Sequence, residues 1–127
     1  MPLDEADLKL LWDMLEAARD AAAFVQGVEY QEYLDNRMRR FAVERAVEII
    51  GEAARHVSEG GRAQVPGVAW GAVVATRHIL AHDYGDVEHV KIWRIATVHA
   101  PKLIELLTPI LRDNPPGPES LKDPGEL

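Results

Sequence analysis

Apolar residues recur at steps of three and four along most of this chain, which is the period of an amphipathic α-helix. Four such stretches stand out: residues 4–26, residues 35–58, a third from about residue 68 to the sequence DYGD, and residues 87–112. Short links join them, and no stretch alternates apolar and polar residues as a β-strand does. The pattern therefore predicts an all-α fold, an antiparallel bundle of four main helices.

Residues that begin or end helices punctuate this pattern. Asp4 can cap the first helix and Gly27 can end it, while either Asp35 or Asn36 can cap the second. The sequence SEGGRAQVPG, residues 58–67, contains a pair of glycines and then a proline. This composition predicts a loop between the second and third helices.

The second expected helix is apolar around more of its circumference than a single packing face requires. Such a helix lies either in the centre of a bundle or against a second subunit, and the pattern gives these two positions equal support. The residues concerned form two rows: Met38, Ala42, Ala46, Ile49, Ala53 and Val57 in one, and Phe41, Val43, Val47, Ile50 and Ala54 in the other.

Prolines shape the last expected helix and the sequence that follows it. Pro101 lacks a backbone donor and should bend the helix near residues 97–100, and Pro109 can end it early. Residues 113–127 contain four prolines and are predicted to form a disordered tail outside a helical domain of residues 1–112. The core row expected in this helix is Val90, Trp93, Ala100, Ile104, Leu107 and Leu111.

Composition narrows the class of protein. Apolar residues make up 47% of the 127 residues, enough for one core, and the absence of cysteine excludes disulfides and thiolate chemistry. The acidic start of the chain is unlike a secretion signal, and no apolar run is long enough to span a bilayer, so we expect a soluble cytoplasmic protein. The net charge of −7 argues against a general nucleic-acid binder, yet residues 36–112 hold eleven basic and eight acidic residues.

Polar and charged side chains are concentrated in the sequence TRHILAHDYGDV, residues 76–87, where the third helix is expected to end. An arginine guanidinium matches the geometry of a phosphate, and histidine transfers protons near neutral pH. Arg77 and His82 could therefore cleave RNA without a metal, the histidine taking the proton of a ribose 2′-hydroxyl and the arginine holding the developing charge. On a helix the two residues lie about 140° apart, so they converge only if the helix end and the following turn meet, with or without a second subunit.

Two other interpretations of this cluster are open. The side chains can serve only to satisfy free carbonyls and the helix dipole at the end of the third helix, at about 0.3–1 kcal/mol each. Alternatively, His78 and His82 can bind a metal ion with Asp83 or Asp86 as a third ligand. The sequence lacks the glutamate of the His-Glu-x-x-His metal motif, which counts against this second alternative.

Three residues of the cluster, Arg77, His82 and Tyr84, have the spacing Arg-x4-His-x-Tyr. Three further sequences accompany them: AVERAVEIIGEAARHVSE, VPGVAW and VEHVKIWRIATVHAPKLIELL. Together they resemble the motif, the second long helix, the Pro-x-x-x-Trp entry to the motif helix and the last helix of the HepT-like toxins. These toxins are a branch of the HEPN superfamily of nucleotide-binding helical proteins. The resemblance spans roughly residues 5–112.

This resemblance implies a dimeric all-α RNase that needs no metal or cofactor, with the motifs of both subunits at the dimer interface. Arg77 and His82 would be catalytic, and His78 and Asp83 would support them. The implied partner is a minimal nucleotidyltransferase antitoxin, which adds AMP to Tyr84 and so silences the toxin. The residue after the motif arginine is often asparagine in this family and is His78 here, which leaves open a catalytically inert dimer that binds a nucleotide or a protein.

Basic residues outside the motif are candidates for contacts with RNA phosphates. All of them lie in the second expected helix, and they are Arg37, Arg39, Arg40 and Arg55. The alternative for each is a salt bridge along the same helix to Glu44, Glu48 or Glu52.

Overall fold

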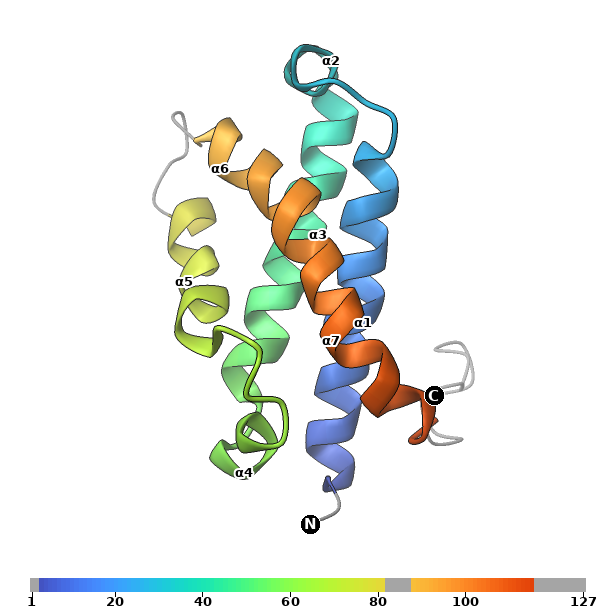
Figure 1. Cartoon of the computed structure of the whole chain (residues 1–127). Helices are drawn as coiled ribbons and strands as arrows, with labels where there is room; N and C mark the ends of the chain where they lie inside the picture. The colour runs from blue at the N-terminus through green and yellow to red at the C-terminus, as the bar shows by residue number, and fades with distance from the viewer. Residues whose placement is uncertain (1–2, 82–87, 116–127) are drawn as a thin grey trace, which may run out of the picture.

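The computed structural model describes residues 3–81 and 88–115, and within these ranges every regular element is helical, which confirms the expected all-α fold. None of the described helices is both long and apolar enough to cross a membrane. The elements, in chain order, are α1 (Glu5–Val25), α2 (Tyr30–Asp35), α3 (Arg37–His56), α4 (Glu59–Ala63), α5 (Trp70–Ala81), α6 (His89–Arg94), the π-helical turn η1 (Ile95–His99) and α7 (Ala100–Arg112) (Figure 1).

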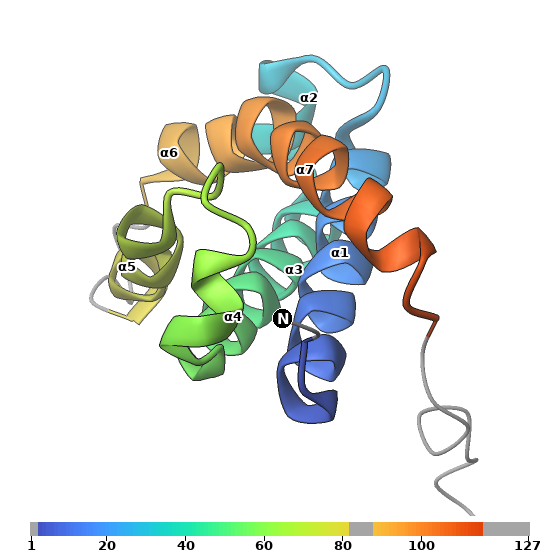
Figure 2. The ribbon, with the colours of Figure 1, turned by 60° about the horizontal axis from the view of Figure 1, so that its bottom comes forward.

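Helix α3 is the centre of the bundle. Helix α1 packs along one side of it and α5 along another, while η1 and α7 cross over α1 (Figures 1 and 2). Leu11, Leu15, Val47 and Leu107 have no exposed surface and belong to the single core that these helices share. Among the described elements, α5 packs closely against α3 alone, so the flank of α5 that faces α6 and α7 is left without a tightly packed neighbour.

The two apolar rows of the second expected helix meet different surroundings. Most of these residues are buried, and α3 lies between α1 and α5, which confirms a central place in the bundle. Met38 and Phe41, in the first turns of α3, are instead 80% and 54% exposed. A subunit contact at this end of the helix stays a prediction.

Side chains cap the two long helices as the sequence predicts. Oδ1 of Asp4 accepts a hydrogen bond of 2.8 Å from the backbone of Asp7, and Oδ1 of Asn36 accepts one of 2.9 Å from the backbone of Arg39. Asn36 rather than Asp35 is thus the cap of α3. Asp35 belongs instead to α2, a separate helix of six residues that the apolar periodicity did not reveal.

The loop predicted between the second and third helices was wrong over its first half, which forms α4. Ser58 caps this helix by accepting a hydrogen bond of 3.1 Å from the backbone of Gly61. Arg62 donates hydrogen bonds of 3.2 Å and 3.1 Å to the carbonyls of Val57 and Ala54, which satisfies the free end of α3. A helix of five residues is too short for apolar periodicity to indicate it.

The last expected helix runs through α6 and α7 but widens into the π-turn η1 just before Pro101. The backbone N–H of Ala100 donates to the carbonyl of Ile95, five residues earlier, instead of four. The backbone is therefore irregular at residues 97–100, where the sequence predicts a bend. Because a π-turn adds one residue to the helical repeat, it also changes which side chains of α6 and α7 share a face.

Two expectations for this helix were wrong. Pro109 does not end it, because α7 continues to Arg112 and is held on the core by Leu107 and Leu111, which have no exposed surface. Val90, expected in the core row, is 49% exposed. The predicted core row assumes one constant helical period. The extra residue of η1 shifts that period, so Val90 lies away from the face that α7 buries.

Candidate active site

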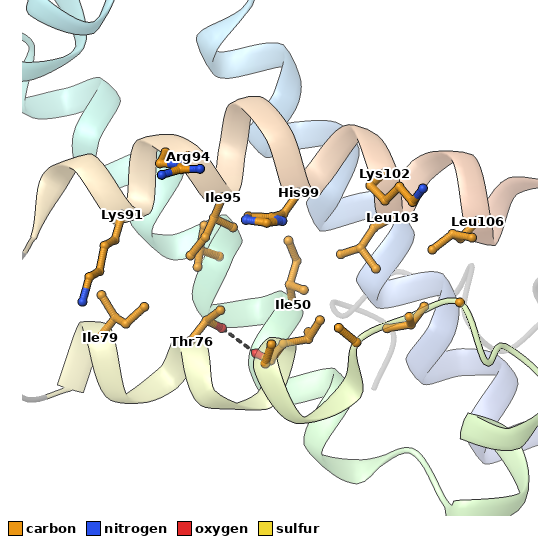
Figure 3. Close-up of a pocket in the computed structure, with 16 residues that line it drawn as sticks. Ile50, Thr76, Ile79, Lys91, Arg94, Ile95, His99, Lys102, Leu103 and Leu106 are labelled. Atoms are coloured by element: carbon orange, nitrogen blue, oxygen red, sulfur yellow. Dashed lines mark hydrogen bonds between the residues drawn. The ribbon is translucent and has the colours of Figure 1, made fainter.

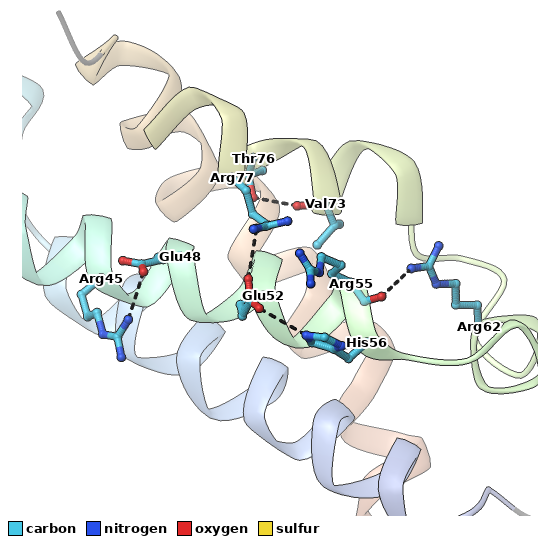
Figure 4. A network of polar contacts seen from close by, with 9 residues as sticks. All are labelled: Arg45, Glu48, Glu52, Arg55, His56, Arg62, Val73, Thr76 and Arg77. Carbon is cyan, nitrogen blue, oxygen red and sulfur yellow. Dashed lines mark hydrogen bonds and ion pairs between the residues drawn. The ribbon is translucent and has the colours of Figure 1, made fainter. Parts of the chain in front are cut away.

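Arg77 lies near the C-terminal end of α5, where that helix meets α3. Its Nε is 3.1 Å from Oε2 of Glu52, and 34% of its side-chain surface is exposed (Figure 4). One edge of the guanidinium is therefore fixed by the carboxylate. The exposed part of the planar fork can still bind an anion from solvent.

Gly51 makes this pairing possible, because α3 and α5 approach each other closely at this point. A Cβ atom on Gly51 would lie 2.9 Å from Oγ1 of Thr76 and 3.0 Å from Cγ of Arg77, closer than side chains normally pack. The hydroxyl of Thr76 is itself turned to the carbonyl of Val73, at 2.7 Å. The absence of a side chain at Gly51 thus lets the residue after it, Glu52, reach Arg77.

Glu52 is surrounded by more positive charge than it can neutralise. Nε2 of His56 lies 3.2 Å from its Oε1, and Arg77 and Arg55 add their charges from two sides (Figure 4). The hydrogen bond to His56, and then the charges of Arg77 and Arg55, hold the pKa of the Glu52 carboxyl below its usual value. One carboxylate among two guanidinium groups and an imidazole leaves a local excess of positive charge, which suits a phosphate ligand.

The structure places only part of the predicted motif. Arg77 is paired as described, and His78 is an exposed residue of α5. The predicted His82, Asp83 and Tyr84 lie outside the described residues, so their convergence with Arg77 stays a prediction. Within residues 3–81 and 88–115, no three His, Asp or Glu side chains are grouped as metal ligands would be. The alternative metal site depends on His82 and is therefore a matter for experiment.

The four arginines predicted to contact RNA phosphates have different surroundings. The guanidinium of Arg37 lies 5.0 Å from the ring centre of Phe41, an exposed cation–π contact. Arg55 is also exposed, and Arg39 is half-buried. Arg40 points between helices, with Nη1 3.4 Å from Nε2 of His89 on α6. Arg37 and Arg55 are thus the two best exposed of the four.

A second polar cluster, which the sequence did not suggest, lies between α2, α3 and α6. Four of its buried polar atoms have no hydrogen-bond partner within the described residues: the hydroxyl of Tyr33, Nε of Arg40, Oε2 of Glu44 and Nδ1 of His89. Burial raises the pKa of the Glu44 carboxyl, although the charges of His89 and Arg40 oppose this effect. Burial, and then the charge of Glu44, also raise the pKa of the Tyr33 hydroxyl, which is therefore neutral at physiological pH.

Glu52 is the residue of the candidate site that the sequence did not indicate. Its position in the second expected helix suggested a partner within that helix, such as Arg55. The ion pair instead crosses to Arg77 on α5. The available indication was the glycine before it, because a glycine inside a helix often marks a close approach of another element.

The chain is a small helical bundle that holds a partly exposed arginine among basic groups, with a histidine and a tyrosine following that arginine in the sequence. The family described as "Ribonuclease HepT-like" matches residues 14–110, which is most of the chain. The protein therefore belongs to the HepT-like family, and the resemblance seen in its sequence is confirmed.

Several relatives share this length of sequence. A Methanocaldococcus jannaschii protein named "Putative RNase MJ1380" is 38% identical over 102 residues, covering 80% of this chain and 94% of the relative. A second protein of that organism, "Putative RNase MJ1216", is 29% identical over 87% of this chain and 93% of its own length. "Probable ribonuclease HepT" of Thermococcus cleftensis is 29% identical over 73% of this chain and 84% of its own. No solved structure matches the chain at the significance applied to these relatives.

Proposed function

We propose that this protein is a metal-independent endoribonuclease whose catalytic residues are Arg77 and His82. Its place in the HepT-like ribonuclease family and the names of its relatives support this reaction class. The assignment of Arg77 rests on its pairing with Glu52, which holds a partly exposed guanidinium at a site rich in positive charge. RNA phosphates are the substrate groups that such a site would bind, with Arg37, Arg39, Arg40 and Arg55 as further candidate contacts.

In the proposed reaction, His82 removes the proton from a ribose 2′-hydroxyl, and the 2′-oxygen then attacks the adjacent phosphorus. Arg77 stabilises the negative charge that develops on the phosphate oxygens. The bond from phosphorus to the 5′-oxygen breaks, and that oxygen takes a proton from His82 of the partner subunit. The products are a 2′,3′-cyclic phosphate and a 5′-hydroxyl, and general acid–base assistance of this kind contributes about 10²- to 10⁴-fold.

The division of work between two histidines requires a homodimer, which is part of the proposal. The exposed apolar side chains Met38 and Phe41 at the start of α3, with Val90 on α6, support a contact between copies. Val90 follows the motif segment closely in the sequence, so a contact there would bring two motifs together. Single exposed apolar residues are common, but three of this size on neighbouring elements are typical of an interaction surface.

We further propose that the protein is the toxin of a toxin–antitoxin pair in the cytoplasm. The partner would be a minimal nucleotidyltransferase that adds AMP to the hydroxyl of Tyr84. Membership of the HepT-like family supports this proposal. An AMP phosphate on Tyr84 would add negative charge beside Arg77 and could occupy the place of the RNA phosphate.

RNA cleavage by single variants tests the catalytic assignment. We expect Arg77→Ala and His82→Ala each to lower the rate of cleavage by roughly 10²-fold or more, without loss of helix content in circular dichroism. Arg45→Ala is the matched control, because Arg45 is an exposed arginine of α3 whose ion pair with Glu48 lies away from Arg77. This control should retain the parent rate.

Added EDTA distinguishes the proposed chemistry from the metal alternative. Cleavage should continue at the same rate in the presence of the chelator. Activity that is lost with EDTA and restored by zinc would instead support a metal site at His78 and His82. A purified dimer that binds nucleotide but cleaves no RNA would support the inert alternative.

A further inference from the structure

A groove of about 520 Å³ separates α5 from the arm formed by α6, η1 and α7 (Figure 3). Val47 and Ile50 of α3 form its floor, and Val73 and Ile79 of α5 contribute one wall. The groove exists because α5 packs closely against α3 alone among the described elements. The catalytic proposal makes no use of it.

The opposite wall of the groove carries a row of cations. Lys91, Arg94, His99 and Lys102 come from α6, η1 and α7, and the described residues that line the groove with them include no acidic side chain. Lys91 pairs with Glu88 at 2.7 Å, whereas Arg94 and Lys102 make no ion pair within the described ranges. From Lys91 to Lys102 the row extends about 16 Å along the helical axis. A basic row of this length is notable in a chain whose net charge is −7.

The lining of the groove limits what can bind there. A single anionic head group would need one or two cations, whereas this row extends along the whole wall. RNA has a suitable row of charges, but its bases bind by stacking on aromatic rings or by hydrogen bonds. Among the described lining residues there is no Phe, Tyr or Trp, and the imidazole of His99 is the one ring that could stack on a base. The hydroxyl of Thr76 is turned to the carbonyl of Val73. Long apolar side chains together with a row of carboxylates fit this surface better.

We propose that the groove binds an acidic amphipathic helix of another protein. The apolar side chains of that helix, spaced at i, i+3, i+4 and i+7, enter between α5 and α7, in the way that helices commonly dock into apolar grooves. Acidic residues along one flank meet Arg94, His99 and Lys102. The acidic helix of a second copy, α1, cannot supply this face, because most of its own apolar face is buried in the core.

A synthetic peptide provides the direct test. The probe is a fluorescein-labelled helix of about four turns, roughly 14 residues, with leucines at the spacing above and glutamates along one flank. We expect saturable binding to the full-length protein in fluorescence anisotropy. A matched peptide with glutamine in place of glutamate should bind about tenfold more weakly, and added salt should reduce that difference. A scrambled peptide of the same composition should not bind.

Variants of the protein then locate the binding site. The double variant Arg94→Glu with Lys102→Glu should weaken binding of the glutamate peptide by about tenfold or more. Ala72→Trp, a substitution of an exposed lining residue on α5, should block the groove and have a similar effect. Arg45→Glu reverses an exposed cation outside the groove and should leave binding unchanged. Circular dichroism establishes that each variant is folded.

Several results would overturn the proposal. Absence of saturable binding by the folded parent protein is one, and equal affinity for the glutamate and glutamine peptides is another. Displacement of the peptide by a short RNA, lost in the same rim variants, would assign the groove to RNA. Displacement by a medium-chain fatty acid would assign it to a small ligand. Self-association that the rim variants abolish would make the groove an interface between copies.

Discussion

At the level of single residues, the pairing of Arg77 with Glu52 raises the question of what happens when substrate arrives. The side chain of Glu52 is 50% exposed and that of Arg77 is 34% exposed. Ion pairs with this degree of exposure are weak because solvent screens them, so in the proposed reaction an RNA phosphate can replace the carboxylate at small cost. In the proposed site, Glu52 would therefore be a positioning residue that holds the guanidinium until the substrate takes its place.

We expect Glu52→Gln to tighten RNA binding, because the phosphate then no longer competes with a carboxylate. The KM for RNA cleavage should fall by about two- to fivefold, which corresponds to the strength of an exposed pair. Glu48→Gln, which removes an exposed glutamate paired with Arg45, is the control and should leave KM unchanged. A KM that rises in the Glu52 variant would mean that the carboxylate assists binding rather than competing with it.

The buried carboxyl of Glu44 should make stability depend on pH. Burial between Tyr33, Arg40 and His89 raises its pKa in the folded protein above the value in the unfolded chain. Between these two pKa values the folded state binds more protons than the unfolded state. The free energy of unfolding therefore falls as pH rises through this window and stays reduced above it.

Glu44→Gln should remove that fall, which urea unfolding at a series of acidic to neutral pH values would measure. The exposed Glu52 has the opposite sign, because its lowered pKa gives a contribution that is present above its unfolded pKa and lost as pH falls. Solvent exposure keeps this second effect small. An unchanged pH profile in the Glu44 variant would contradict the role assigned to this carboxyl.

At the level of residues, the sequence could predict interactions between groups that lie close together along the chain. Asp4 and Asn36 cap helices because a cap bonds to a backbone group only three residues away. The pair of Glu52 with Arg77 and the approach of Arg40 to His89 join distant parts of the chain. No spacing rule within one helix could indicate them.

At the level of elements, the contact between α3 and α5 depends on Gly51. Replacing a helical glycine with alanine normally stabilises a helix by about 0.5–1 kcal/mol. At Gly51 the new Cβ would meet Thr76 and Arg77 at 2.9 and 3.0 Å, and such overpacking costs about 1–3 kcal/mol. We therefore expect Gly51→Ala to lower the free energy of unfolding by about 1 kcal/mol and to reduce RNA cleavage, because Arg77 is displaced.

Gly71→Ala is the matched control for this substitution. Gly71 lies in α5, and a Cβ added there has no neighbouring atom within 4 Å among the residues that the structure describes. Its stability in urea should be unchanged or slightly higher, with the parent rate of cleavage. Destabilisation of both variants alike would show that backbone effects, not the close approach of α3 and α5, account for the loss.

Element length decided which helices the sequence could predict. The long helices α1 and α3 repeat their apolar pattern over several turns, whereas α2 and α4 are six and five residues long. Pro101 correctly indicated an irregular backbone, but its effect took the form of a π-turn that rotates Val90 outward. The prediction that Pro109 ends the helix early was wrong, because packing of α7 on the core outweighs one lost backbone hydrogen bond.

At the level of the whole molecule, two surfaces are suited to two different contacts. Met38 and Phe41 in the first turns of α3 and Val90 on α6 are large apolar side chains that are exposed. The groove lined by Arg94 and Lys102 is apolar within and basic at its rim. In the proposals made above, the exposed apolar side chains contact a second copy of the same chain and the groove binds an acidic partner, so dimerisation and partner binding need not compete.

The last prediction concerns whether the two copies share one active site. An Arg77→Ala homodimer has two copies of His82 and no Arg77. A His82→Ala homodimer has two copies of Arg77 and no His82. A mixed dimer has one of each. If the cleft is shared, mixing the two inactive variants and allowing their subunits to exchange should restore RNA cleavage above the level of either variant alone.

The mixture should recover only part of the parent rate, because statistical exchange makes about half of the dimers mixed and each has one Arg77 and one His82. The remaining histidine can act as the base, but no second histidine is present to act as the acid. Adding Phe41→Glu to both variants provides the control, because a charge on the exposed apolar surface should prevent the copies from associating. Light scattering would verify the monomeric state of these proteins. If exchange is demonstrated by mass and yet cleavage stays at the level of the variants, one Arg77 and one His82 on opposite subunits do not form a working site, which contradicts the shared cleft. Recovery that persists in the monomeric controls would also exclude it, since complementation would then not depend on the proposed interface.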